Sequence, residues 1–151
     1  MKRKYRTTQR ENTKYSFDCK LGKNKKMDDA VYALRKNVMK YIYEAKQIIE
    51  SAGFDFTRQN IRIVERNDEN YRTALGCGAM NDNIVWIPDC VAANDPDLRF
   101  IVFHELGHSM FGLNHDSKCP LMNAVITRGM DAGSIHKIFL RYVRKNLGGK
   151  K

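Results

Sequence analysis

The segment His104-Glu105-Leu106-Gly107-His108 has the side chains and the spacing of a zinc site that hydrolyses amide bonds. Residues four apart lie above one another on a helix, so two imidazoles with this spacing can reach the same metal ion. Zinc lowers the pKa of a bound water and polarises a substrate carbonyl, and a neighbouring glutamate can take the proton of that water. The segment therefore predicts His104 and His108 as metal ligands and Glu105 as the general base.

The residues around this segment indicate a buried helix. Apolar side chains occupy residues 100–103 immediately before it, and Met110 and Phe111 follow it. Burying His and Glu side chains is costly unless a partner satisfies them, and a metal ion with its water would do so. The alternative interpretation is a helix whose polar face carries two His and one Glu by chance, and the apolar setting disfavours it.

A third ligand is expected downstream, because the chain has no His before this segment and no Glu after it. The candidates are His115, Asp116, Asp131 and His136. His115 is preferred, since it follows the turn residue Gly112, where a reversing chain can bring an imidazole back to the metal. Asp116 would compete for the metal or orient a ligand. His136 lies near the border of the polar face of its helix, which favours a surface histidine.

Three segments, at residues 104–108, 112–116 and 121–123, together resemble the metzincin clan of zinc peptidases, closest to its matrixin-like forms. The pattern of that clan is H-E-x-x-H-x-x-G-x-x-H, followed by a turn with a methionine beneath the metal. The resemblance implies His104, His108 and His115 as zinc ligands, Glu105 as the base and Met122 as the methionine of the turn.

The chain has a one-residue insertion relative to that pattern. Ser109, Met110 and Phe111 separate His108 from Gly112, where the clan has two residues. One extra helical residue moves the exit of the helix by ~1.5 Å and rotates it by ~100°. A bulge in the helix or a reshaped turn would absorb this change.

The resemblance also implies how a peptide substrate is held. An edge strand just before the active helix, at residues 78–87, would bind it in extended, antiparallel form through Ile84, Val85 and Trp86. Residues 124–127 would line the pocket after the cleaved bond. The clan's occasional tyrosine ligand is not expected, because Ala124 stands there, and Cys19 does not lie in a cysteine-switch motif.

Three helices are predicted, the first and third from apolar periodicity and the second from its start signal. The first runs from Asp28 to Ala52, with a stripe that includes Val31, Leu34, Val38, Tyr41, Ala45, Ile48 and Ala52, and Gly53 closes it. The second begins with Asp95 as cap and Pro96 in its first turn, and ends at Phe111 before a left-handed Gly112. The third runs from about Gly133 to Leu147.

The strands are predicted at residues 60–65 and 84–87, with a weaker one at 71–80 that forms a hairpin through the turn at 81–83. This order of elements favours an α+β domain. We expect a small twisted mixed sheet with a long backing helix, an active-site helix, a Met-turn and a C-terminal helix.

The charge of the chain is uneven. Residues 1–26 contain ten Lys or Arg and two acidic residues, so they carry +8 of the net charge of +10. We interpret residues 1–26 as a basic, flexible arm and residues 27–151 as one zinc-peptidase domain. A solvated tail is the simplest interpretation of the arm, and contact with nucleic acid or an acidic partner is the alternative.

Composition excludes several classes of protein. No segment approaches the ~20 apolar residues of a membrane helix, and the basic start is not followed by the apolar run of a secretory signal. These features favour a cytoplasmic or virion-associated protein without a membrane partner. The four cysteines, Cys19, Cys77, Cys90 and Cys119, form no C-x-x-C pair, so a cysteine zinc ribbon is not expected.

The function predicted from the sequence is that of a zinc-dependent endopeptidase acting on peptide or protein substrates. Two alternatives belong to other classes. One is an inactive or structural zinc-binding protein, which the intact Glu105 disfavours. The other is a nucleic-acid-associated protein that acts through residues 1–26.

Overall fold

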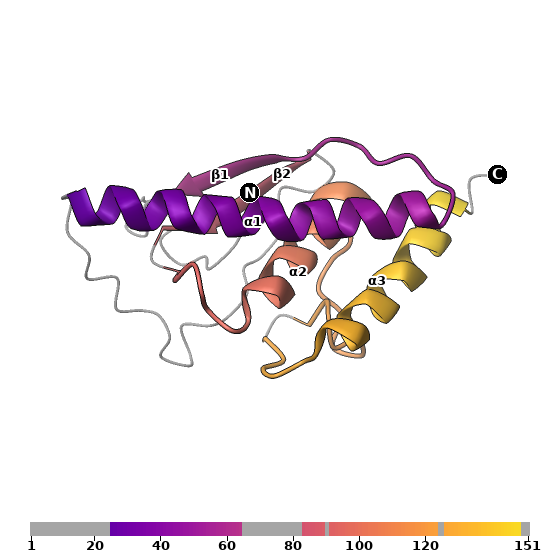
Figure 1. The fold of residues 1–151 in the computed structure, drawn as a ribbon. Coiled ribbons are helices and arrows are strands. Elements are labelled where there is room, and N and C mark those ends of the chain that lie inside the picture. The colour runs from indigo at the N-terminus through magenta and orange to yellow at the C-terminus, as the bar shows by residue number, and fades with distance from the viewer. Residues whose placement is uncertain (1–24, 65–82, 90, 124–125, 149–151) are drawn as a thin grey trace, which may run out of the picture.

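The computed structural model describes residues 25–64, 83–89, 91–123 and 126–148. Its elements are α1 (Lys25–Ser51), β1 (Asn60–Val64), β2 (Ile84–Pro88), α2 (Leu98–Phe111) and α3 (Ala132–Leu147). The long helix α1 spans the molecule, with the two strands along one side of it and α2 and α3 on the other (Figure 1). The predicted α+β class is confirmed at this level.

The two described strands are parallel. Asn60 lies opposite Ile84 and Val64 opposite Pro88. Within the described residues the sheet is therefore a parallel pair, and the expected mixed sheet is not seen there. The predicted strand at 71–80, which would form the hairpin, lies outside the described residues.

A buried polar network joins the start of both strands to the end of α2. The Ser109 hydroxyl donates to Gln59 Oε1, and Gln59 Nε2 donates to Asn83 Oδ1, both at 2.8 Å. Asn83 has a positive φ of 56°, and its N–H donates to the Ser109 carbonyl while its own carbonyl accepts from the N–H of Asn60. The end of α2 is thus hydrogen-bonded to the sheet next to His108.

α1 supplies the backing of the core. Its buried stripe steps by three and four residues and consists of Leu34, Val38, Ile42, Ala45 and Ile49. The predicted stripe is correct in direction but displaced, because Tyr41 and Ile48 are only partly buried at its border. The helix begins three residues before the predicted Asp28, since Lys25, Lys26 and Met27 are good helix formers. It closes, as predicted, at a left-handed Gly53.

The start of α2 differs from the prediction. The Asp95 carboxylate accepts the N–H of Asp97 at 2.8 Å, and its carbonyl accepts the N–H of Leu98. These bonds form a separate turn, so the helix begins at Leu98 with Asp97 as its N-cap residue. The predicted left-handed closure at Gly112 is confirmed, with φ of 67°.

α3 covers α2 from the other side. Its buried residues are Ile135, Ile138, Phe139 and Val143, all of which lie on one face of the helix. The ring of Phe139 meets the ring of Phe103 of α2 edge-on, with centroids 4.9 Å apart. The helix α2 therefore lies between two amphipathic helices.

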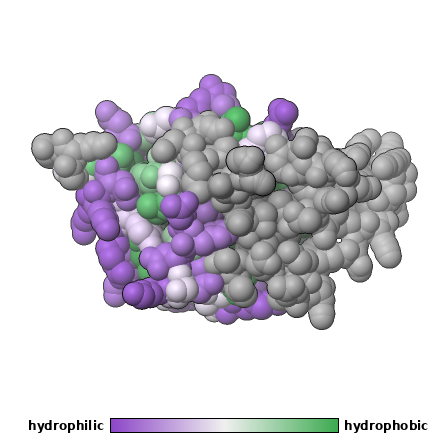
Figure 2. Space-filling view, turned by 180° about the vertical axis from the view of Figure 1, so that it is seen from behind, coloured by the Kyte–Doolittle hydropathy of each residue, from purple (hydrophilic) through white to green (hydrophobic). Residues whose placement is uncertain are grey.

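The described helices do not include one long and apolar enough to cross a membrane. On the face shown in Figure 2, the described surface is mostly hydrophilic, with small apolar patches between the polar side chains.

Candidate metal centre

The central part of α2 is buried on every side. Residues 100–109 are all buried, and His104, Glu105 and His108 have no exposed surface. His115, on the loop after the helix, is partly exposed, so the cluster that it joins lies beneath the surface on the loop side. A helix of this kind can hold polar side chains only where they are satisfied by partners.

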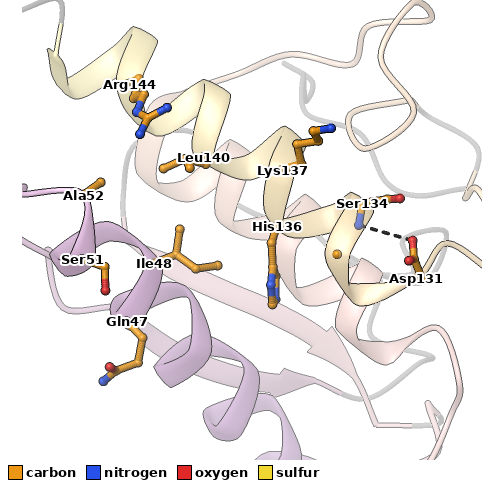
Figure 3. Close-up of a pocket in the computed structure, with 11 residues that line it drawn as sticks. Gln47, Ile48, Ser51, Ala52, Asp131, Ser134, His136, Lys137, Leu140 and Arg144 are labelled. Carbon is orange, nitrogen blue, oxygen red and sulfur yellow. Dashed lines mark hydrogen bonds between the residues drawn. The ribbon is translucent and has the colours of Figure 1, made fainter.

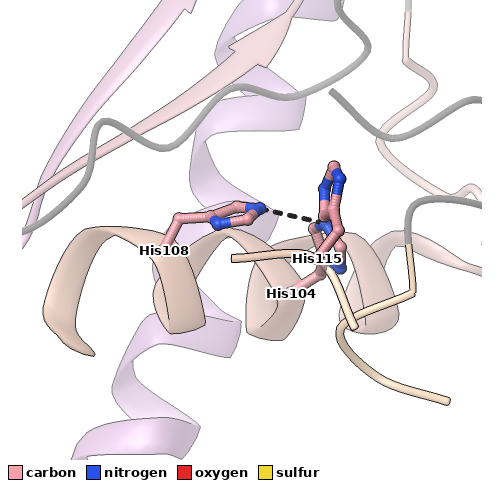
Figure 4. Close-up of side chains that lie close together, drawn as sticks. All are labelled: His104, His108 and His115. Carbon is pink, nitrogen blue, oxygen red and sulfur yellow. Dashed lines mark hydrogen bonds between the residues drawn. The ribbon is translucent and has the colours of Figure 1, made fainter. Parts of the chain in front are cut away.

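The three histidines His104, His108 and His115 come together at one point (Figure 4). Nε2 of His104 lies 3.3 Å from Nε2 of His108 and 3.3 Å from Nε2 of His115. Nitrogen atoms bound tetrahedrally to one metal ion at 2.0–2.1 Å are about 3.3 Å apart. The observed spacing therefore fits three imidazoles on one transition-metal ion.

Backbone carbonyls orient the two buried imidazoles. Nδ1 of His104 is 2.6 Å from the Leu121 carbonyl, and Nδ1 of His108 is 2.6 Å from the Leu113 carbonyl. A carbonyl can only accept, so each Nδ1 carries the proton and each Nε2 presents a lone pair to the shared point. Metal-binding histidines are commonly oriented by such a bond from the other ring nitrogen.

The buried surroundings also keep His104 neutral. Burial is the main cause that holds the pKa of His104 well below its usual range, and the nearby charges of His108 and His115 act in the same direction. The hydrogen bond to Leu121 opposes this shift without reversing it. A neutral imidazole is the form that binds a metal.

The closing turn of α2 absorbs the inserted residue. α1 ends with the N–H of Phe54 bonded to the carbonyl of Ile49, five residues back, as in an ordinary Schellman closure. At the end of α2 the N–H of Leu113 is bonded instead to the carbonyl of Gly107, six residues back. This wider closure takes up one residue and still returns the chain so that His115 reaches the cluster.

Met122 lies directly under the helix at Gly107. A Cβ atom at position 107 would be 2.6 Å from Sδ of Met122, which shows that the helix and the loop touch here. The loop is closed by the N–H of Asp116, which donates to the Met122 carbonyl at 2.8 Å. Met122 thus packs against α2 at Gly107, the residue before His108.

The other candidates for a third ligand are not in the histidine cluster. The Asp116 carboxylate is exposed and accepts the N–H of Lys118, while the Asp131 carboxylate caps α3 by accepting the N–H of Ser134. His136 bonds to Glu44 and packs on Phe103. Of the four residues considered, His115 is the one that the fold brings to His104 and His108.

Glu105 is fully buried on the same helix but is not one of the clustered ligands. Adjacent helical residues point about 100° apart, so Glu105 and His104 leave the helix in different directions. Among the described residues, Glu105 therefore neighbours the histidine cluster in sequence but is not part of it.

The predicted substrate residues on β2 differ in exposure. Val85 is fully buried, whereas Ile84 and Trp86 are partly exposed, and the guanidinium of Arg62 lies over the Trp86 ring. A peptide could therefore meet the side chains of Ile84 and Trp86, and Val85 only through its backbone. Ala124 and Val125 of the predicted pocket lie outside the described residues.

A cavity between two of the helices lies away from the histidine cluster. A cavity of about 670 Å³ lies between α1 and α3, with Ile48 and Leu140 on opposite walls (Figure 3). His136 lines it, but none of the three clustered histidines does. The metal centre is thus recognised from the geometry of its side chains and not from the size of a cavity.

Sequence reasoning missed the residues that support the cluster. Leu113 and Leu121 act through their carbonyls, which every residue has, so no side-chain pattern could identify them. Gly107 carried a usable signal, because a glycine inside a helix lowers its stability and indicates close packing.

With this geometry established, known proteins were compared. No protein family, curated protein or solved structure matches this chain. The arrangement of residues on α2 and its following loop is therefore the basis for any functional conclusion.

Proposed function

We propose that this protein is a zinc-dependent endopeptidase. The observation that carries the proposal is the convergence of the Nε2 atoms of His104, His108 and His115, with each buried ring oriented through Nδ1. The adjacent buried Glu105 and the resemblance of the motif to the metzincins support the same interpretation.

Zinc is the metal that the donor set suits best. Three neutral imidazoles at tetrahedral spacing are the protein ligands of many catalytic zinc sites, which leave a fourth position for the reaction. No carboxylate or thiolate belongs to the described cluster, which makes calcium, magnesium and iron–sulfur centres poor matches.

When bound, zinc would supply Lewis acidity that polarises a peptide carbonyl and acidifies water. Glu105 would accept the proton of the attacking water and deliver it to the leaving amine, so that one carboxylate serves both steps. The partly exposed His115 lies on the side from which a peptide could approach.

The first prediction concerns Glu105. The parent protein is expected to bind about one zinc per chain and to hydrolyse peptides, whereas Glu105→Gln should keep the zinc and lose at least about 100-fold in kcat. Gln preserves the volume of the buried side chain, so folding should be retained. The measurements are zinc content by elemental analysis and cleavage of a mixed peptide library.

Two results would count against this function. Absence of zinc after reconstitution would remove the metal centre. Zinc binding with no hydrolysis by either protein would instead indicate a structural zinc site.

The second prediction concerns the third ligand. His115→Ala should weaken zinc binding by orders of magnitude, because two histidines on one helix hold zinc poorly, and Asp116→Ala should cost no more than about 10–100-fold. His136→Ala is the matched control, since it removes the same side chain away from the cluster. Competition titration with a zinc chelator ranks the three variants, and parental affinity in His115→Ala would be decisive against this ligand.

A further inference from the structure

A second cavity lies between α3 and the loop that follows the metal centre. Its volume is about 430 Å³, and we call it the basic pocket. The residues on which the inference depends are Lys118 and Cys119 of the loop and Arg141, Tyr142 and Lys145 of α3. One of the two walls therefore belongs to the same loop that carries His115.

The charge of the basic pocket is positive. Lys118, Arg141 and Lys145 line it, and Asp116 is the single carboxylate in its lining. Across the part of the chain that the structure describes, no carboxylate forms an ion pair with any of these three cations. Such a concentration of unpaired positive charge favours an anion.

The dipole of α3 does not account for this arrangement. Cations in the last turn of a helix are favoured by its macrodipole, which explains Lys145. Arg141 lies before that turn, and Lys118 comes from a separate segment of the chain. The three charges meet because the loop is folded against α3.

The pocket also contains a neutral donor. Burial raises the pKa of Tyr142, and a hydrogen bond with Cys119 raises it further, so the phenol remains protonated at neutral pH. Since this hydroxyl is engaged with Cys119, the arginine fork and the two ammonium groups are the donors that suit a carboxylate or a phosphate, which accept several hydrogen bonds at once.

The basic pocket is connected to the metal centre through the loop. Asp116 follows His115, and its carbonyl accepts the N–H of Cys119 in the pocket wall. Leu121, on the other side of the same loop, orients His104. An anion held in the pocket would therefore lie a short stretch of chain from a zinc ligand.

We propose that the basic pocket binds a carboxylate or phosphate group carried by an acidic peptide. The proposal that such a peptide is a substrate rests on the function proposed above, whereas the binding of the anion does not. It assigns acidic peptides as the class of ligand for this protein.

The test measures binding without cleavage. The full chain with Glu105→Gln, loaded with zinc, is titrated by calorimetry with two short peptides that are identical except that one carries Glu where the other carries Gln. A third peptide carries phosphoserine at the same position, and inorganic phosphate is titrated alone. The Glu and phosphoserine peptides should bind about tenfold or more tightly than the Gln peptide.

Two double variants identify the site. Arg141→Gln with Lys145→Gln should remove the preference for the acidic peptides. Arg58→Gln with Lys36→Gln is the matched control, because it removes one arginine and one lysine from exposed positions outside the pocket and should change affinity less than about twofold.

Each result is informative. Equal losses in the two double variants would show non-specific attraction to a basic protein and overturn the proposal, as would equal affinity for the Glu and Gln peptides. Inorganic phosphate that binds more tightly than either acidic peptide would show a site for a free anion. Preferential binding of acidic peptides with no hydrolysis by the parent would support the pocket and remove the peptidase.

Discussion

The contact between Gly107 and Met122 determines how closely the loop approaches α2. A glycine in the middle of α2 lowers helix stability by roughly 0.5–1 kcal/mol relative to alanine. Here it leaves room for Sδ of Met122, which a Cβ would meet at 2.6 Å. Leu121, the residue before Met122, accepts a hydrogen bond from Nδ1 of His104 through its carbonyl. A displacement of Met122 would therefore also change the position of the His104 ring.

We predict that Gly107→Ala destabilises the protein by about 1–3 kcal/mol, because Met122 must move away from the helix. In the Met122→Ala background the same change should be neutral or stabilising by up to about 1 kcal/mol, since the obstruction is gone. Urea denaturation of the four proteins of this cycle gives the coupling energy. Equal effects in both backgrounds would mean that the two residues do not press on each other.

At the scale of residues, the side chains of the site could be predicted from the sequence better than the backbone groups that orient them. His104, His108 and His115 could be proposed because imidazoles are rare in the chain and their spacing has a helical meaning. The carbonyls of Leu113 and Leu121 could not be proposed, because their role depends on where the loop passes. Asp131 is the opposite case: its carboxylate was one of the candidate ligands, but in the structure it caps α3.

At the scale of elements, the side chain of Glu44 links the three described helices by hydrogen bonds. On α1, it accepts two hydrogen bonds from Arg99 of α2, at 2.8 and 3.2 Å, and one from His136 of α3. Burial alone would raise the pKa of Glu44, but the bonds from Arg99 and His136 outweigh burial and lower it. A carboxylate with a lowered pKa stabilises the fold above its unfolded pKa, and this contribution is lost as the pH falls through the folded pKa.

We predict that Glu44→Gln lowers the free energy of unfolding by about 1–2 kcal/mol at pH 7, with allowance for partial exposure. The difference from the parent should shrink as the pH falls from the ordinary pKa of a glutamate down through the lowered pKa of Glu44, because the carboxylate becomes protonated there and its charge no longer contributes. Glu50→Gln is the control on the same helix, because its pair with Lys46 is at 3.9 Å and well exposed. A Glu44→Gln effect that does not change with pH would show that charge is not its cause.

The helices α1 and α3 were predictable because apolar residues recur in each at steps of three and four, whereas α2, which is buried on every side, was predictable from its start signal and its closing glycine. The boundaries of the helices were harder to predict. At the start of α2, Asp95 forms a separate turn, so that Asp97 takes the N-cap position. The pairing of β1 with β2 joins residues 24 positions apart in register, and nothing within either strand specifies its partner.

For the molecule as a whole, a metal ion would add a further link between α2 and the loop that follows it. Two of the clustered histidines belong to α2, and the third belongs to the loop that leads towards α3. Because an ordered cluster of this kind is not expected in the unfolded chain, metal binding should add to folding stability.

We predict that zinc at about 100 times its Kd stabilises the folded protein by about 2.7 kcal/mol, and that a chelator reverses the effect. For a chain of this size the midpoint of thermal unfolding should change by roughly 5–10 °C. His104→Ala should abolish the zinc-dependent change, while His136→Ala should retain it on a lower baseline. Calorimetry with and without chelator measures it, and an unchanged midpoint in the parent would contradict the coupling of metal and fold.

Because of the hydrogen bond from Leu113 to Gly107, the three histidines come together although three residues, not two, separate His108 from Gly112. A sequence motif that requires two residues before the glycine does not match this chain. A search for the distances between imidazole nitrogens does match it. A search for such clusters by the distances between imidazole nitrogens would therefore find chains that a search by residue spacing misses.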